Sequence, residues 1–273
     1  MNIPQKNVEV ILPERIPTHP APVKKSVYNP DLSVIIPVYN EADAITPLLE
    51  EIVTVLENRA HYEIIVVDDG STDATSNVLT KTINETAMPL RFIRHVKNYG
   101  QSAAIHTGIE SARASWIITM DGDGQNNPAD ILKLIAERDN ANSPALKLIC
   151  GHRKRRNDNF VKRASSRIAN IVRALVLRDM TPDTGCGLKL IHRSTFLNLP
   201  FFDHMHRFIP ALMRFYGADI RTVEISHRPR KTGKSKYSIH NRLWVGIIDL
   251  FGMLWLAKRA IQPAKEEITR HDF

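Results

Sequence analysis

The chain has 273 residues, of which 43% are hydrophobic, and a formal net charge of +8 at pH 7. Its two cysteines, Cys150 and Cys186, are too few for a disulfide framework or a cysteine-rich zinc site, and they favour a reducing compartment. The basic excess suits a partner that carries phosphate, such as a nucleic acid, a phosphorylated substrate or an anionic membrane.

The N-terminal segment predicts no packed element. Residues 1–30 contain six prolines, which exclude a continuous helix or a central strand. No charged head followed by a long apolar run is present, so we expect no signal peptide. We therefore expect an extended or disordered arm over residues 1–30.

From Asp31 onward, apolar β-branched runs alternate with stretches that have apolar residues at helical spacing. The order predicts a mainly parallel α/β sheet with helices on both faces. Ser71 or Thr72 is expected to cap the second helix. The expected strands are Leu32–Val38, Glu63–Val67, Leu90–Arg94, Ser115–Met120 and Leu146–Cys150, and the expected helices are Ala44–Arg59, Ala74–Ile83, Gln101–Ala112 and Asp130–Glu137.

Polar residues follow three of these strands at the point where each strand ends. They are Asn40-Glu41, Asp68-Asp69 and the stretch from Asp121 to Asp123. Carboxyl ends of parallel strands meet at one edge of a sheet, where α/β proteins bind ligands. We therefore expect one crevice lined by three polar clusters. No GxGxxG or GxxxxGK[ST] pattern accompanies them, which argues against a dinucleotide oxidoreductase or a P-loop NTPase.

Four short motifs resemble glycosyltransferase family 2, and two later stretches resemble its polyprenyl-phosphate (dolichol- or undecaprenyl-phosphate) hexosyltransferase subgroup. The motifs are Pro37-Val-Tyr-Asn-Glu41, Val66-Val-Asp-Asp-Gly-Ser-Thr-Asp73, Asn98-Tyr-Gly-Gln101 and Asp121-Gly-Asp-Gly-Gln125, and the later stretches are Asp183-Thr-Gly-Cys-Gly-Leu-Lys189 and Arg228-Pro-Arg-Lys-Thr-Gly-Lys-Ser-Lys-Tyr237. The resemblance implies a GT-A catalytic domain over residues 31–237, a UDP- or GDP-sugar donor and a divalent metal.

Carried over residue by residue, the resemblance assigns three groups of site residues. The metal would be held by Asp121, Asp123 and Gln125, whose oxygen atoms suit Mg²⁺ or Mn²⁺. Asp121, Asp123, Arg167 and Arg230 would be catalytic. The donor would contact Pro37, Tyr39, Glu41, Asp69, Asp121 and Arg153, while Asp68 could serve the fold alone.

The acceptor implied by the resemblance is a polyprenyl phosphate. A phosphate monoester is already largely dianionic at neutral pH, so it needs cations to position it rather than a strong general base. Residues 153–178 carry nine Lys or Arg residues against one acid, and the 228–236 stretch adds five. We expect Arg167, His206, Arg230 and Lys236 to face the acceptor phosphate, and direct attack to invert the anomeric centre.

Two other functions compete with this one. A family 2 enzyme that uses a polysaccharide or another hydroxyl acceptor would need a carboxylate base, for which Asp183 is the candidate. A nucleic-acid-binding protein would explain the net charge, but three acidic clusters at the strand ends would repel a polyanion, so no nucleic acid partner is expected.

Two stretches have the pattern of helices at a membrane surface. Val161–Leu177 has an apolar face and a basic face, which also fits ordinary core packing. Leu243–Ala257 is apolar with basic flanks, contains Asp249 and is shorter than the roughly 20 residues that a spanning helix needs. We expect residues 238–273 to form an amphipathic helix and tail that docks on an anionic membrane, on a membrane protein or in the core. The enzyme would then be cytoplasmic and peripheral at the inner membrane face.

Overall fold

The computed structural model describes residues 29–153, 177, 181–229 and 239–259. The predicted arm over residues 1–28, and the predicted acceptor residues Arg167, Arg230 and Lys236, lie outside the described residues. The strands are β1 (Leu32–Val38), β2 (Tyr62–Asp68), β3 (Leu90–Arg94), β4 (Trp116–Thr119), β5 (Leu146–Arg153), β6 (Lys189–His192) and β7 (Asp219–Ile225). The helices are α1 (Ala42–Leu56), α2 (Thr75–Glu85), α3 (Gln101–Ser111), α4 (Ile131–Asp139), α6 (Arg193–Leu197), α7 (Ile209–Phe215) and α8 (Ile239–Arg259), with short 3₁₀ helices η1 (Pro128–Asp130) and η2 (Met205–Arg207).

Seven strands form one mixed sheet in the order β3-β2-β1-β4-β6-β5-β7. Strands β1 to β4 pair in parallel, as do β5 and β7, whereas β6 runs antiparallel between β4 and β5. The predicted α/β class and mainly parallel sheet are confirmed, and β6 and β7 are additions. The chain moves outward from β1 to β3 and returns on the other side of β1 as β4. The ends of β1 and β4 thus flank the point at which the strand order reverses, where such sheets bind ligands.

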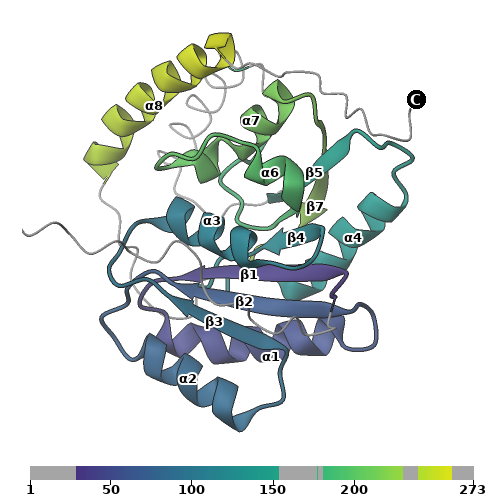
Figure 1. The fold of residues 1–273 in the computed structure, drawn as a ribbon, viewed down its shortest axis with the longest axis vertical. Coiled ribbons are helices and arrows are strands. Elements are labelled where there is room, and N and C mark those ends of the chain that lie inside the picture. Colours follow the sequence, from purple (N-terminus) through teal and green to yellow (C-terminus); the bar gives the residue numbers. More distant parts are fainter. Residues whose placement is uncertain (1–28, 154–176, 178–180, 230–238, 260–273) are drawn as a thin grey trace, which may run out of the picture.

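Helices cover both faces of the sheet, as expected (Figure 1). Alternate residues of β1 point to opposite faces: Val34 and Ile36 pack with α1, α2 and α4, whereas Ile35 packs with α3, α6 and α7. A Cβ added to Gly108 of α3 would lie 2.3 Å from Ile35 Cγ2, so this glycine lets α3 approach β1 closely. Helix α3 therefore packs close against β1.

The predicted cap of α2 is wrong. The backbone N–H of Thr75 donates to Asp73 Oδ1 at 2.9 Å, and neither Ser71 nor Thr72 caps the helix. Both hydroxyl residues bond instead to Asn40 at the end of β1. The sequence pattern placed them at a helix start, but the loop after β2 uses them to join two strand ends.

Helix α8 extends beyond the predicted Leu243–Ala257 at both ends. Its inward side is anchored by Met253, which is fully buried, with Leu250 and Leu254 packed against the same core. Within the described ranges, no helix combines the length and the apolar character that crossing a bilayer requires.

Candidate active site

The ends of β1 and β2 are tied together by a turn at Asn40. Asn40 adopts a left-handed backbone with φ 54°, and its N–H donates to Ser71 Oγ at 2.9 Å. Its side-chain Oδ1 accepts from the N–H of Thr72 at 2.7 Å. The next residue, Glu41, donates its N–H to Thr75 Oγ1 at 2.9 Å. Two of the three predicted polar clusters are therefore adjacent, with Pro37 and Tyr39 immediately before the turn.

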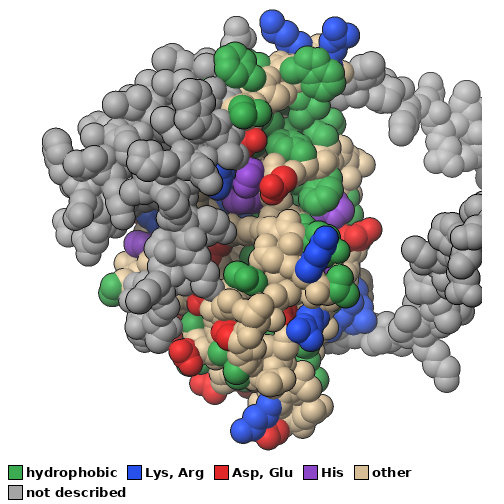
Figure 2. Space-filling model, turned by 90° about the vertical axis from the view of Figure 1, so that its left-hand side faces the viewer, with side chains coloured by type: hydrophobic (Ala, Val, Ile, Leu, Met, Phe, Trp, Pro, Cys, Tyr) green, Lys and Arg blue, Asp and Glu red, His purple; other side chains and the backbone are tan. Residues whose placement is uncertain are grey.

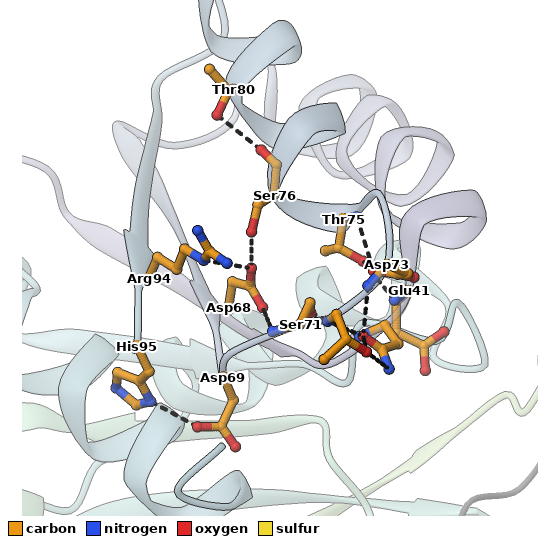
Figure 3. Close-up of polar contacts among 12 residues, drawn as sticks. Glu41, Asp68, Asp69, Ser71, Asp73, Thr75, Ser76, Thr80, Arg94 and His95 are labelled. Carbon is orange, nitrogen blue, oxygen red and sulfur yellow. Dashed lines mark hydrogen bonds and ion pairs between the residues drawn. The ribbon is translucent and has the colours of Figure 1, made fainter. Parts of the chain in front are cut away.

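Asp68 is completely buried and holds the loop that follows β2. Its Oδ1 accepts from the N–H of Ser71 at 2.8 Å, and its Oδ2 accepts from the hydroxyl of Ser76 on α2 (Figure 3). Arg94 approaches the same Oδ2 at 3.9 Å. These contacts fit the structural role that the sequence allowed for Asp68.

Asp69 is almost fully buried and binds the segment that leads into α3. Its Oδ1 accepts from the backbone N–H of Tyr99 at 2.9 Å, and its Oδ2 accepts from the N–H of Gly100 at 2.7 Å. His95 Nδ1 lies 2.7 Å from Oδ1 (Figure 3). Its Nε2 lies 3.0 Å from Thr107 Oγ1. Because a carboxylate only accepts, the proton of a neutral His95 sits on Nδ1, and Nε2 accepts from Thr107. Asp69 thus fixes the position at which α3 begins.

The first residue of α3 reaches the third polar cluster. Gln101 Nε2 donates to Asp121 Oδ1 at 2.9 Å. Burial raises the pKa of Asp121 to about 6, and the neighbouring charge of Asp123 adds to the effect, while Lys189 and Arg153 oppose it. The hydrogen bonds through Asp69, Gly100 and Gln101 therefore connect the second and third clusters. The predicted proximity of the clusters is confirmed, and the crevice that they would line stays a prediction.

Asp121 and Asp123 have the donor atoms that a divalent cation needs. No cluster of three or more His, Cys, Asp or Glu side chains forms a closed metal site within the described ranges. A carboxylate whose pKa is raised by burial and by a neighbouring carboxylate, as that of Asp121 is, gains from a nearby cation. A metal that also binds phosphate oxygens requires open coordination positions. Gln125 follows on the same loop, and its N–H donates to Asp123 Oδ1 at 3.1 Å. These residues fit Mg²⁺ or Mn²⁺.

Arg153 is held in a bidentate ion pair. Its Nε and Nη2 donate to Asp183 at 2.7 and 2.9 Å, and both side chains are at least 90% buried. Burial works against the charge of Arg153, but hydrogen bonding to Asp183 and its charge together raise the pKa of the guanidinium. Arg153 is thus a fixed cation beside Asp121, and Asp183 is engaged as its partner.

His206 is a partly buried side chain. Its Nδ1 lies 2.7 Å from Ser102 Oγ, and its backbone N–H donates to the same oxygen at 3.2 Å. Burial lowers the pKa of His206 to about 3, and the charges of Arg207, Lys189 and His204 lower it further. A neutral imidazole brings no positive charge to a phosphate, so this geometry does not favour the predicted contact of His206 with the acceptor.

The described residues that precede Arg230 are bonded to the loop that carries Asp123 and Gln125. The N–H of Arg228 donates to the carbonyl of Gln125 at 3.0 Å, and His227 forms a β-bridge with Asn126. Arg228 also donates to Glu51 at 2.6 Å and to Asn127 at 2.7 Å. Residues 226–229 are therefore fastened directly to the loop that carries Asp123 and Gln125.

Sequence reasoning assigned no role to three residues that the structure places beside Asp121. They are Gln101, Gly187 and the buried Lys189, whose Nζ donates to the carbonyl of Cys186. Gln101 is the last residue of the motif Asn98–Gln101, and Lys189 is the last residue of the stretch Asp183–Lys189, which also contains Gly187. Their presence in these two motifs was the signal that the sequence offered.

The family model described as Glycosyl transferase family 2 matches residues 33–200. A dodecaprenyl-phosphate galacturonate synthase from Rhizobium johnstonii is 35% identical over 237 residues, which cover 85% of this chain and 69% of that protein. An undecaprenyl-phosphate 4-deoxy-4-formamido-L-arabinose transferase from Salmonella choleraesuis is 32% identical over 225 residues, covering 80% of this chain and 64% of the relative. The chain thus spans about two thirds of the length of these relatives.

The fold is also similar to that of solved proteins. The crystal structure of glucosyl-3-phosphoglycerate synthase from Mycobacterium tuberculosis in complex with Mg²⁺ and uridine diphosphate matches with a TM-score of 0.62. The match covers 84% of this chain and 79% of that chain at 16% sequence identity. At this identity the similarity supports the GT-A fold alone.

Proposed function

Because the chain belongs to glycosyl transferase family 2, as its motifs predicted, we propose that it transfers a sugar from a nucleotide diphosphate sugar to a polyprenyl phosphate. The observation that carries the proposal is the pair Asp121 and Asp123 at the strand-order reversal, in a chain 35% identical to a polyprenyl-phosphate sugar transferase. The predicted family and subgroup are confirmed by the same comparisons.

In this proposal the donor lies across the ends of β1, β2 and β4. Pro37, Tyr39 and Glu41 would face its nucleoside. Asp69 would hold the loop before α3 and would also contact the nucleoside. Asp121, Asp123 and Gln125 would hold Mg²⁺ or Mn²⁺, which offsets the charge that builds on the leaving diphosphate. Arg153, fixed by Asp183, would place a permanent positive charge beside the same diphosphate.

The acceptor would attack without a protein base. A phosphate oxygen of the polyprenyl phosphate forms a bond to the anomeric carbon while the bond from that carbon to the nucleoside diphosphate breaks. Attack from the opposite side inverts the centre. We assign acceptor binding to Arg167, Arg230 and Lys236 from their motifs, and Arg228 supports this because its backbone bonds to Gln125.

The hydroxyl-acceptor alternative has less support. It requires Asp183 to take a proton from the acceptor, but both carboxylate oxygens of Asp183 accept from Arg153 at 2.7 and 2.9 Å. Withdrawing that carboxylate would leave a buried guanidinium without its partner, which is costly.

The test compares polyprenyl phosphate with free polyprenol under identical conditions. A panel of UDP- and GDP-sugars with Mn²⁺ first identifies a donor by thermal shift, and transfer is then followed as radiolabel that becomes extractable into butanol. We expect product with the phosphate alone. Equal turnover of polyprenol would contradict the proposed nucleophile, and water-soluble product would favour the hydroxyl-acceptor alternative.

We also propose that α8 places the enzyme on an anionic membrane surface. Ile248, Phe251 and Trp255 are 68%, 69% and 64% exposed on the side of α8 away from Met253. Lys258 and Arg259 are exposed at the end of the helix, where they would meet anionic headgroups. Figure 2 shows hydrophobic side chains gathered at the top of the molecule, at the height of α8 in Figure 1, with basic side chains beside them.

Vesicle binding tests this surface. Substituting Phe251 and Trp255 together by Ser should lower partitioning onto vesicles of anionic lipid at least about tenfold, because a buried side chain of this size contributes about 1.5–3 kcal/mol. Ile83→Ser is the matched control, because Ile83 is a 38% exposed apolar residue on α2. Unchanged partitioning of the double variant would exclude α8 as the membrane contact. If the wild-type protein forms concentration-dependent dimers that the double variant does not form, the exposed side of α8 binds a second copy of the chain instead.

A further inference from the structure

The carboxylate of Asp121 rests directly on the backbone of Gly187. A Cβ added to Gly187 would lie 2.3 Å from Asp121 Cγ and Oδ2 and 2.5 Å from Oδ1. Gly187 is not among the described glycines with positive φ, which are Gly70, Gly100, Gly124 and Gly217. The position therefore requires glycine for space and not for backbone conformation.

The backbone at Gly187 is itself held in place. The hydroxyl of Thr119, at the end of β4, donates to the carbonyl of Gly187 at 2.8 Å. Two residues later β6 begins, and Lys189 is paired with Thr119 across the antiparallel ladder. The carbonyl of Cys186, on the other side of Gly187, accepts from Lys189 Nζ. Strand β4, which ends two residues before Asp121, is thus bonded to the segment on which the Asp121 carboxylate lies.

A second residue limits the carboxylate from another direction. Gln101 Nε2 donates to Oδ1 at 2.9 Å, and Gln101 is placed by the N–H of Gly100, which donates to Asp69 at 2.7 Å. Gln101 is the first residue of α3, and Gly187 lies two residues before β6, so the two contacts come from segments far apart in the sequence. Together they restrict the carboxylate, because Oδ1 is hydrogen-bonded and main chain lies against the group.

We propose that Gly187 and Gln101 are positioning residues that fix the Asp121 carboxylate in the orientation in which it binds the divalent cation. The cation belongs to the proposed function, on which this part of the inference rests. The contact between Gly187 and Asp121 does not depend on it. Second-layer residues of this kind typically change metal affinity by about 10- to 100-fold when they are replaced.

The contact is tested first without metal, by a double-mutant cycle in urea. Gly187→Ala should destabilise the wild-type protein, because the new methyl group overlaps the Asp121 carboxylate. The same substitution should cost less in an Asp121→Ala background, where the overlap is removed. An equal loss of stability in both backgrounds would overturn the contact.

The positioning role is tested next by the affinity for Mn²⁺ in the presence of UDP or GDP, measured by electron paramagnetic resonance of free Mn²⁺. We expect Gly187→Ala and Gln101→Leu each to weaken Mn²⁺ binding by about 10- to 100-fold. Gly108→Ala is the matched control, because its Cβ would come equally close, at 2.3 Å, to Ile35 in the core. It should lower stability and leave Mn²⁺ affinity unchanged. Gly252→Ala, which meets no atom within 4 Å and lies inside α8, should not lower stability and should leave Mn²⁺ affinity unchanged.

The outcomes separate this inference from the proposed function. A wild-type protein that binds Mn²⁺, with Gly187→Ala and Gln101→Leu variants that bind it equally well, would overturn the positioning role and leave the function intact. A wild-type protein that binds no Mn²⁺ with either nucleotide would overturn the proposed function and with it the role of Asp121 as a ligand. A loss confined to the two variants supports the inference.

Discussion

The two acidic pairs of the molecule have similar sequences and opposite surroundings. The first acid cluster, Asp68 and Asp69, receives hydrogen bonds from the protein on all four carboxylate oxygens. In the second acid cluster, Asp121 and Asp123, the donors within the described part of the chain are the Gln101 side chain and the N–H of Gln125, and the pKa of Asp121 is raised to about 6. Both clusters follow a strand at the same edge of the sheet.

The difference shows how a fold separates structural from chemical carboxylates. Buried acids that accept several N–H and O–H bonds have their charge stabilised internally and hold loops together. Acids that face each other with few donors hold their charge at a cost, which an external cation removes. The first acid cluster therefore holds the loops at this edge of the sheet, and the second acid cluster has, among the described residues, no cation bonded to its carboxylates and suits an external one.

The largest effect on activity is expected in the second acid cluster, Asp121 and Asp123. Asp123→Asn removes a metal ligand but no packing, so transfer should fall by about 10³-fold, equal to roughly 4 kcal/mol of the barrier. The melting temperature should stay at the wild-type value. Activity is measured with saturating Mg²⁺ or Mn²⁺. Full activity under those conditions would remove the distinction between the clusters.

The reverse pattern is expected at Asp68. Asp68→Ala leaves the N–H of Ser71 and the hydroxyl of Ser76 without an acceptor in the interior, so the free energy of unfolding should fall by roughly 2–4 kcal/mol. Urea denaturation measures this loss. The control is Asp43→Ala, since Asp43 is exposed in the first turn of α1 and should contribute no more than about 1 kcal/mol. Equal losses for the two variants would show that burial of Asp68 has no special role.

Acid is expected to lower stability through His206, which bonds to Ser102 next to Gln101 on α3. Its pKa is about 3 in the fold and 6.5 ordinarily, so the unfolded chain takes up the proton first. Its contribution to stability is complete above pH 6.5 and is lost as the pH falls toward 3, with roughly 2 kcal/mol gone between pH 7 and 5.

Asp121 acts with the opposite sign, because its raised pKa lets the folded protein bind that proton before the unfolded chain does. The contribution of His206 is therefore read as the difference between wild type and His206→Gln across this pH range. If the two stability curves run parallel from pH 7 to pH 5, His206 is not buried in its neutral form.

The smallest expected effect is a change in donor affinity at Asp69, which tests whether the first acid cluster, Asp68 and Asp69, serves the fold alone. Asp69→Asn loosens the bonds to Tyr99 and Gly100 that hold the loop before α3, so we expect donor affinity to fall about tenfold, or roughly 1.4 kcal/mol. Calorimetry with the nucleotide sugar measures it. Unchanged affinity would restrict Asp69 to fastening the loop before α3.

Much of the donor side could be predicted because its signals are local. Leu32–Val38 and Leu90–Arg94 have the predicted ends, since apolar β-branched runs stop where polar residues begin. The polar residues after β1, β2 and β4 follow the same rule, and parallel pairing brings them together.

The surroundings of Asp121 could not be predicted in the same way. Strand β6 has four residues, Lys189–His192, and its place between β4 and β5 depends on pairing with distant segments. Gly187 has no side chain, and its role is visible only when the distance to the Asp121 carboxylate is known. The Asp183–Arg153 pair was missed for a similar reason, because each residue matched a separate motif with its own expected role.

The antiparallel insertion of β6 also gives the molecule an order of assembly. Strands β1 to β4 come from one continuous stretch, whereas β6 returns after β5 to pair with β4. Such long-range pairing must overcome loop-closure entropy before its contacts stabilise it, so it forms late. A refolding chain therefore has both carboxylates of the second acid cluster before it has the main chain that orients one of them. We expect tight Mn²⁺ binding to appear only when the whole sheet is complete, which makes the cation a reporter of finished folding.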